Sequence, residues 1–129
     1  MVGERYGGIM KILVIDDDTM ILKMSDFLLR KAGHEVITAE SAQQAIELLS
    51  QKPELIFADN QMPQMSGVEL LEMLRGSEET KDIPVCMMSG TLSQELIAKV
   101  VKFGAVGCIE KPLQQMDMLR IIEGVKMGG

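Results

Sequence analysis

The chain has 129 residues, a formal net charge of −6 and 47% hydrophobic residues. This length suits one domain, and the composition is that of a globular chain rather than a disordered one. The acidic balance argues against a nucleic-acid surface, which is normally basic, so we expect no direct nucleic-acid binding. No apolar run approaches the roughly 18 residues of a membrane span, and the first residues lack the apolar segment of a secretory signal. We therefore expect a cytoplasmic protein that does not contact membranes.

Five short apolar runs predict β-strands at residues 11–15, 35–39, 55–58, 85–88 and 107–110. At least four of them are continuously apolar, which is typical of strands covered on both faces. A longer helical pattern follows each run, and this alternation predicts one α/β domain with a parallel sheet and helices on both faces. We place this domain at residues 10–127. Residues 1–9 are expected to be an N-terminal extension, flexible or added at cloning.

The first helical segment has a predicted apolar face formed by Met20, Met24, Phe27 and Leu28, and it ends at residues 32–33. The chain has 12 methionines, most of them at apolar-periodic positions of this kind. Methionine fills irregular spaces in a core, so we interpret them as core residues rather than as metal ligands or redox groups.

The later helical segments are predicted from their starts. The second opens at Ser41 with Gln44 three residues on, and the fourth opens at Thr91 with Gln94, both with the spacing of a capping box. The third begins near residue 68, after the turn at 63–67. The fifth follows Pro112 and continues to the C-terminus.

Polar side chains follow four of the predicted strands: Asp16, Asp17 and Asp18 after the first, Asp59 after the third, Ser89 after the fourth and Lys111 after the fifth. Parallel strands bring their carboxyl ends to one edge of the sheet, where ligands bind. Clustered carboxylates repel one another unless a cation neutralises them, and hard oxygen ligands favour Mg²⁺, which also accepts a phosphate oxygen. A hydroxyl and an ammonium would hold further phosphate oxygens. The set predicts a site that places a phosphoryl group on a carboxylate or removes it.

Each of these residues also has an ordinary structural explanation when it is taken alone. Asp18 would cap the helix that follows it, and Asp59 would be part of a turn. Ser89 and Lys111 would be common loop residues. One shared site explains all four strand ends together, so we favour the site.

Four motifs carry a resemblance to a known family: KILVIDDD at the first strand, IFADNQMPQMSG around Asp59, VCMMSG at Ser89 and GCIEKP at Lys111. With these motifs, and with spacings of 30 positions from Asp59 to Ser89 and 22 from Ser89 to Lys111, the chain resembles the receiver domain of two-component response regulators. The resemblance covers residues from about Met10 to Met127. It implies a flavodoxin-like (βα)5 fold with strand order 2-1-3-4-5.

The resemblance also implies roles for the site residues. Asp59 would be the phosphoacceptor, supplied by the phosphohistidine of a sensor histidine kinase or a histidine phosphotransfer protein. Asp17 and Asp59 would bind Mg²⁺ directly, Asp16 through water, and Gln61 through its backbone carbonyl. Ser89 and Lys111 would each hold a phosphoryl oxygen, and the Lys111–Pro112 peptide would be cis.

The sequence says less about how the domain passes its signal to a partner. The family implies a surface of the fourth helix, fifth strand and fifth helix that acts on a downstream effector, which the sequence does not identify. The domain would be a monomer or a phosphorylation-dependent dimer, and a signalling domain rather than an enzyme acting on other substrates. We expect its switch region at Gly90, Thr91 and Cys108.

The sequence departs from common family patterns at three of these positions. Cys108 replaces the usual Tyr or Phe switch residue, Gln61 replaces a shorter Asn, and Gly90 leaves the mouth of the pocket open. His34, the single histidine, lies between a helix and a strand and is expected at the surface. The phosphoryl donor must then be another molecule.

Two alternatives remain at this point. A haloacid-dehalogenase-type phosphatase would use Asp16 as nucleophile in its DxD motif, but it needs a further acidic pair after the lysine. Only Asp117 and Glu123 remain there, and this reading gives Asp59 no role. A degenerate receiver that only binds partners is a second alternative, which the complete set of acids, serine and lysine disfavours.

Overall fold

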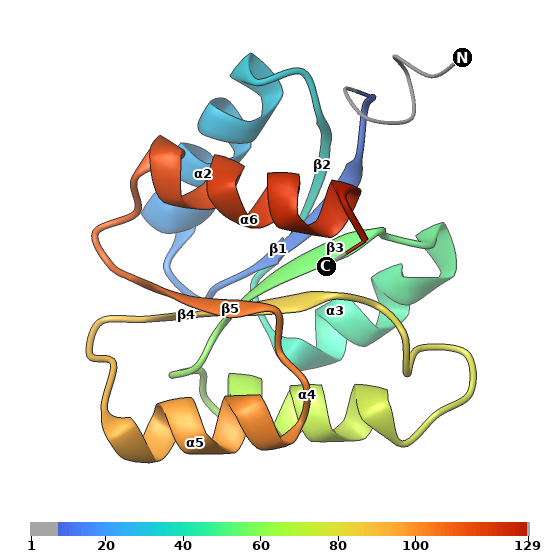
Figure 1. Ribbon diagram of the computed structural model, residues 1–129, viewed down its shortest axis with the longest axis vertical. Helices are drawn as coiled ribbons and strands as arrows, with labels where there is room; N and C mark the ends of the chain where they lie inside the picture. The colour runs from blue at the N-terminus through green and yellow to red at the C-terminus, as the bar shows by residue number, and fades with distance from the viewer. Residues whose placement is uncertain (1–7, 129) are drawn as a thin grey trace.

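The computed structural model describes residues 8–128 (Figure 1). Within them, one parallel sheet has the order β2-β1-β3-β4-β5. Its strands are β1 (Lys11–Ile15), β2 (Glu35–Ala39), β3 (Leu55–Asp59), β4 (Val85–Ser89) and β5 (Gly107–Glu110). The fold class and the strand order are therefore confirmed. Strands β3 and β4 run one residue further than predicted and end on Asp59 and Ser89. Residues 1–7 of the expected extension lie outside the described residues.

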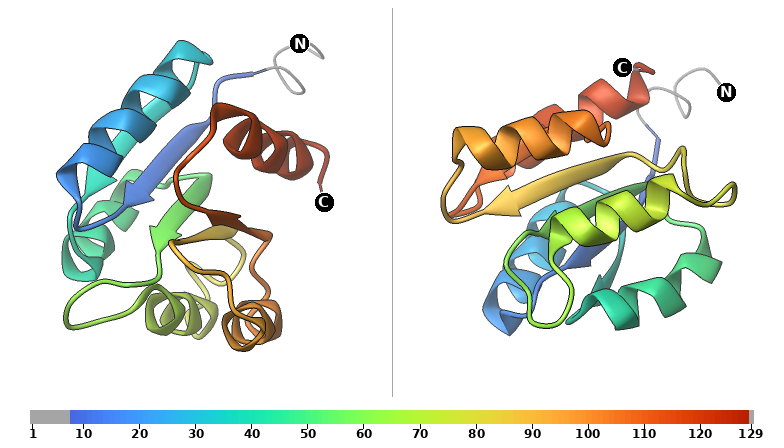
Figure 2. Two further views of the ribbon diagram at one scale, coloured as in Figure 1. Left: turned by 90° about the vertical axis from the view of Figure 1, so that its left-hand side faces the viewer. Right: turned by 90° about the horizontal axis from the view of Figure 1, so that it is seen from below.

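Helices cover both faces of the sheet. They are α2 (Thr19–Lys31), α3 (Ala42–Leu48) with the short 3-10 turn η1 (Leu49–Gln51), α4 (Gly67–Arg75), α5 (Gln94–Lys102) and α6 (Gln115–Lys126). Helices α2 and α6 lie on one face, and α3, α4 and α5 on the other (Figures 1 and 2). Each layer buries its own apolar cluster against the sheet. Among residues 8–128, no helix is long and apolar enough to cross a membrane.

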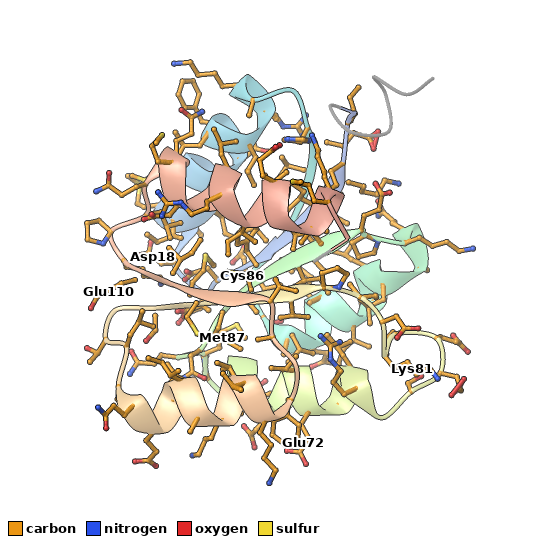
Figure 3. All side chains as sticks on the ribbon, in the orientation of Figure 1. Asp18, Glu72, Lys81, Cys86, Met87 and Glu110 are labelled. Atoms are coloured by element: carbon orange, nitrogen blue, oxygen red, sulfur yellow. The ribbon has the colours of Figure 1, made fainter. Side chains whose placement is uncertain are left out.

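Neighbouring residues of one strand contribute to opposite clusters. Cys86 packs toward α2 and α6, whereas Met87 packs toward α3, α4 and α5 (Figure 3). Strand side chains alternate between the two faces of a sheet, so a strand with helices on both sides must be apolar throughout. All residues of β3 and β4 are buried. This explains why the continuous apolar runs were a reliable sign of the strands.

The predicted apolar face of α2 is wrong at three of its four residues, and only Leu28 packs against the core, partly buried. Met20, Met24 and Phe27 are 68%, 45% and 63% exposed, and the buried residues of the helix are Leu22, Ser25 and Leu29. The exposed set and the buried set both have helical spacing. Because the buried set includes the small polar Ser25, the sequence did not show it as an apolar face. The interpretation of the methionines as core residues fails here too, and also at Met73, Met116 and Met127. It holds for the buried Met10, Met62, Met87, Met88 and Met118.

The helix starts are partly as predicted. Ser41 caps α3 by accepting a hydrogen bond from the Gln44 amide, although the Gln44 side chain accepts from the Glu40 amide instead of completing a capping box. The predicted start at Thr91 is wrong, because Ser93 caps α5. A complete capping box that the sequence analysis missed, Ser66 with Glu69, starts α4 at residue 67 rather than near 68.

The expectation that His34 lies at the surface is also wrong. Its side chain is only 8% exposed, and its Nδ1 atom accepts a hydrogen bond of 3.0 Å from the backbone N–H of Met10. The pKa of His34 is lowered by burial and by the nearby Lys126, while Glu123 acts in the opposite sense. Lys126 and Glu123 belong to α6, so the charges that shift this pKa come from the last helix.

Arg75, the last residue of α4, donates three hydrogen bonds to backbone carbonyls. Its acceptors are the carbonyls of Phe103 (2.9 Å), Ile83 (2.9 Å) and Gly104 (3.3 Å). These carbonyls belong to the segment before β4 and to the end of α5. The guanidinium therefore joins α4 to both neighbouring segments at the edge of the sheet opposite the aspartates.

Candidate functional site

The candidate site lies at the carboxyl edge of the sheet. Asp16 directly follows β1, Asp59 and Ser89 end β3 and β4, and Lys111 directly follows β5. Asp18 and Glu110 mark this edge in Figure 3. Asp18 caps α2 through a hydrogen bond from the Met20 amide, which is the ordinary structural role considered for it. The other predicted residues meet because parallel strands in register end together.

Lys111 is the centre of the site. Its ammonium lies 2.7 Å from Asp16 Oδ2 and 3.1 Å from Asp59 Oδ1. The side chains of Asp16 and Asp59 are 0% and 5% exposed, and that of Lys111 is 20% exposed. One partly buried cation thus joins two buried anions, and removal of any partner would leave an unpaired charge in a largely dry environment.

The pKa values of Asp59 and Lys111 are shifted by burial and by the neighbouring charges. Burial raises the pKa of Asp59, and Asp16 and Asp17 add to the increase, while the hydrogen bond from Lys111 opposes it. Burial lowers the pKa of Lys111, but its close interactions with the carboxylates of Asp16 and Asp59 outweigh this effect and raise it. The ammonium is therefore firmly protonated at neutral pH, whereas the ionised form of Asp59 is costly without a further cation.

The acidic groups fit a divalent cation. One ligand oxygen from each of Asp16, Asp17 and Asp59 can be chosen so that all three lie within 4.8 Å of one another. Asp16 and Asp59 are buried and Asp17 is exposed. Asp16 Oδ1 accepts a hydrogen bond from the Asp18 amide, while Oδ2 receives none of good geometry despite the nearby ammonium. Hard oxygen ligands with one open side suit Mg²⁺, which retains water and accepts a phosphate oxygen.

The hydroxyl of Ser89 is engaged with the loop that follows β4. Its Oγ atom donates to the carbonyl of Thr91 (2.8 Å) and accepts from the amide of the same residue (3.2 Å). A Cβ atom at Gly90 would meet nothing within 4 Å, so this part of the loop is open, as expected. Ser89 is thus at the site edge, with its hydroxyl bonded to Thr91 in the loop that follows rather than to a carboxylate.

The remaining predicted residues surround this centre. Gln61 is exposed in the loop between β3 and α4, and its role as a carbonyl ligand stays a prediction. Cys108 of β5 is the register partner of Met87 of β4, and it packs toward the layer of α3, α4 and α5. The Lys111–Pro112 peptide is cis, as the resemblance implied.

Sequence reasoning missed two residues next to the site, Asn60 and Gly67. The Asn60 carbonyl accepts from the Gly67 amide (3.0 Å), and the Asn60 side chain accepts from the Val68 amide (3.3 Å). Both residues stand in the IFADNQMPQMSG motif, but nothing in the sequence showed that the start of α4 packs on the end of β3.

Comparison with known proteins gives the family. The sequence model of the response regulator receiver domain matches residues 12–123. The chain belongs to this family. The two-component response regulator ORR5 of Oryza sativa subsp. japonica is 32% identical over 125 residues, which cover 95% of this chain and 93% of that protein. The phosphate regulon transcriptional regulatory protein PhoB of Pseudomonas aeruginosa is 33% identical over 115 residues, which cover 88% of this chain and 50% of that protein.

Solved structures agree with the sequence comparisons. The chemotaxis protein CheY4 of Vibrio cholerae superposes with a TM-score of 0.85 at 29% identity, covering 91% of this chain and 98% of that one. A CheY-like receiver domain from Methanospirillum hungatei gives a TM-score of 0.84 at 29% identity and covers 93% and 95%. The protein is therefore a phosphoacceptor receiver domain of two-component signalling with an acidic pocket of Asp16, Asp17 and Asp59.

The family assignment decides between the alternatives. A receiver domain is a signalling domain and not a classical enzyme, and the acidic triad is typical of the Mg²⁺ site of receivers. A haloacid-dehalogenase-type phosphatase would need Asp117 and Glu123 as its further acidic pair. Asp117 instead forms an ion pair with Arg120, and the charge of Glu123 partly opposes the burial that lowers the pKa of His34. Neither residue contacts the carboxylates of the pocket among the described interactions, so the phosphatase reading has no support.

Proposed function

We propose that Asp59 accepts a phosphoryl group from the phosphohistidine of a sensor histidine kinase or a histidine phosphotransfer protein, with Mg²⁺ held by Asp16, Asp17, Asp59 and the carbonyl of Gln61. The observation that carries this proposal is the convergence of three carboxylates and the Lys111 ammonium at one edge of the sheet. Asp59 is the only one of the three carboxylates that ends a central strand, with the polar Ser89 ending the neighbouring strand.

In the transfer step, a carboxylate oxygen of Asp59 attacks phosphorus and forms an acyl phosphate. The bond from phosphorus to the imidazole nitrogen breaks, and its electron pair stays on that nitrogen. Lys111 neutralises one phosphoryl oxygen and the Ser89 hydroxyl donates to another. A divalent cation held by Asp16, Asp17 and Asp59 would supply positive charge that offsets the repulsion between these carboxylates and the phosphoryl group.

Incubation with acetyl phosphate and Mg²⁺ tests the assignment. We expect one phosphoryl group per chain, mapped to Asp59 and released by hydroxylamine, and no labelling of the Asp59→Asn variant. Labelling at Asp16, or continued turnover of p-nitrophenyl phosphate, would contradict the assignment and return the phosphatase to consideration.

The signal would leave the site through the loop that follows Ser89. If the Ser89 hydroxyl turns toward the phosphoryl group, it must leave its two hydrogen bonds with Thr91, and Gly90 offers the backbone freedom for the loop to follow. Cys108 is too small to act as an aromatic switch. We expect the change to spread to the start of α5 and so to the surface of α5, β5 and α6.

Beryllofluoride, a phosphoryl mimic, tests this route in the presence of Mg²⁺. Amide NMR shifts should change from Ser89 to Ser93 and along the first turns of α5, while Cys108 keeps its rotamer. A change of rotamer at Cys108 with an unchanged loop would show that the route runs through β5 instead.

Several parts of the proposal concern the surroundings of the domain. The partner kinase and the downstream effector are unidentified, and a cytoplasmic location, a monomer or phosphorylation-dependent dimer and the boundaries 1–9 and 10–127 remain predictions. Size-exclusion chromatography with and without beryllofluoride would decide between the two oligomeric states.

A further inference from the structure

The start of α4 is attached directly to the end of β3. The Gly67 amide donates to the Asn60 carbonyl, and the Val68 amide donates to the Asn60 side chain. The Asn60 amide in turn donates to the Met88 carbonyl of β4 (2.9 Å). The residue after Asp59 is therefore held by β4 on one side and by the first turn of α4 on the other.

Gly67 permits this contact because it has no Cβ atom. A Cβ atom built there would lie 2.5 Å from the carbonyl oxygen of Asp59, 2.6 Å from Met87 Sδ and 3.0 Å from the Cα atom of Asn60. The Met87 sulfur belongs to a flexible side chain and can move. The other two atoms are backbone atoms at the end of a buried strand, so a side chain at position 67 must displace either α4 or the backbone of Asp59.

We propose that Gly67 is a positioning residue for the phosphoacceptor. The start of α4, which has no side chain at position 67, packs against the peptide of Asp59 and fixes the Asp59 carboxylate relative to Lys111 and the other two acids. The inference rests on the proposed function of Asp59. A contact of 2.5 Å is 0.9 Å short of the 3.4 Å at which ordinary contact begins. Because misplacement of a reacting group by about 1 Å can slow a reaction about 100-fold, even partial displacement would be measurable.

The test compares Gly67→Ala with Gly76→Ala, a matched change at the other end of the same helix. A Cβ atom at Gly76 would meet its nearest neighbour, the Met73 carbonyl, at 3.5 Å, which is an ordinary contact. We expect Gly67→Ala to lower the maximal labelling rate with acetyl phosphate by about 10-fold or more and to shift the amide signals of Asp59 and Asn60 without any cation. Gly76→Ala should leave both unchanged. Equal rates and unshifted amides in Gly67→Ala would overturn the inference.

Two further variants separate positioning from crowding of the core. Gly67→Ala combined with Met87→Val removes the contact with sulfur but keeps the contact with the Asp59 carbonyl, so the rate should stay low; recovery of the wild-type rate would overturn the inference. Asn60→Ala removes one acceptor from the start of α4 and should slow labelling by about threefold. If Gly67→Ala does not fold, Asn60→Ala decides, and an unchanged rate there counts against the inference.

Failure of the proposed function would look different. Wild-type protein that is not labelled at Asp59 would overturn the role of Asp59 as phosphoacceptor. The amide shifts of Asp59 and Asn60 in the cation-free protein would still report whether a side chain at position 67 displaces the end of β3.

Discussion

Replacement of Lys111 by methionine would test the electrostatics of the pocket most directly. Methionine keeps most of the length of the lysine side chain but removes the ammonium that lies between Asp16 and Asp59. Breaking a buried ion pair by removing one partner costs about 3–5 kcal/mol. Because Lys111 is 20% exposed, we expect the lower end, about 3 kcal/mol. For a chain of this length, the entropy of unfolding converts that into a loss of about 11 °C in Tm.

The dependence on pH identifies the cause of this loss. Burial already raises the pKa of Asp59, and the hydrogen bond from Lys111 is what opposes the increase, so the Lys111→Met change raises that pKa further. A folded-state pKa above the unfolded value destabilises the fold at neutral pH, and the penalty disappears as the pH falls through the folded-state pKa. The difference in unfolding free energy between the variant and the wild type should therefore shrink from pH 7 toward pH 4.

Urea unfolding followed by circular dichroism, in the presence of a chelator, measures these differences. Addition of Asp59→Asn to Lys111→Met should restore part of the lost stability, because it removes one of the two unpaired carboxylates. A difference below about 1 kcal/mol, or one that stays constant from pH 7 to pH 4, would refute the reasoning and assign the loss to packing of the lysine stem.

Three further expectations concern the cation, the buried histidine and the arginine of α4. Free Mg²⁺ at about tenfold its Kd should stabilise the protein by about 1.4 kcal/mol, or about 5 °C in Tm, and Asp17→Asn should lose most of this response in a thermal melt; an unchanged response would show that the ligand set is wrong. Because burial lowers the pKa of His34, wild-type unfolding free energy should fall as the pH decreases below about 6.5, and His34→Asn should flatten this dependence; identical pH profiles would contradict it. Arg75→Met should cost about 3 kcal/mol in urea unfolding, since three backbone carbonyls lose a charged donor, and Arg75→Lys should recover part of it; a loss below about 0.5 kcal/mol would mean that water replaces the guanidinium.

The sheet and the centre of the site could be predicted from the sequence for the same physical reason. Strands buried on both faces must be apolar throughout, so a polar residue that ends such a run stands out. Asp16, Asp59 and Ser89 are each the first polar residue after an apolar run, and Lys111 follows one residue after the polar Glu110 that ends β5. Parallel strands bring such positions to one edge. The local sequence pattern was therefore sufficient to predict that these residues, which are far apart in the chain, lie in one site.

Features that depend on packing between elements could not be predicted in this way. Helix α2 has two stripes with the same period, and only the sheet beneath it decides that Leu22 and Leu29 are buried rather than Met20 and Met24. His34 is buried, and the charges that shift its pKa belong to α6, which is distant in sequence. The need for glycine at position 67 comes from the backbone of Asp59, and no pattern in a single sequence measures that distance.

The charges of the pocket come from different parts of the chain. Asp16 and Asp17 directly follow β1 and Asp59 ends β3, whereas Lys111 follows β5, the last strand in the chain. A partly folded form that pairs β1, β2 and β3 without β5 would gather these acids without their counter-charge. Their mutual repulsion weakens that partial structure, and the arrival of Lys111 relieves it. Addition of the final strand thus completes the hydrophobic core and the charge balance together, which makes folding more cooperative than the sheet alone would make it.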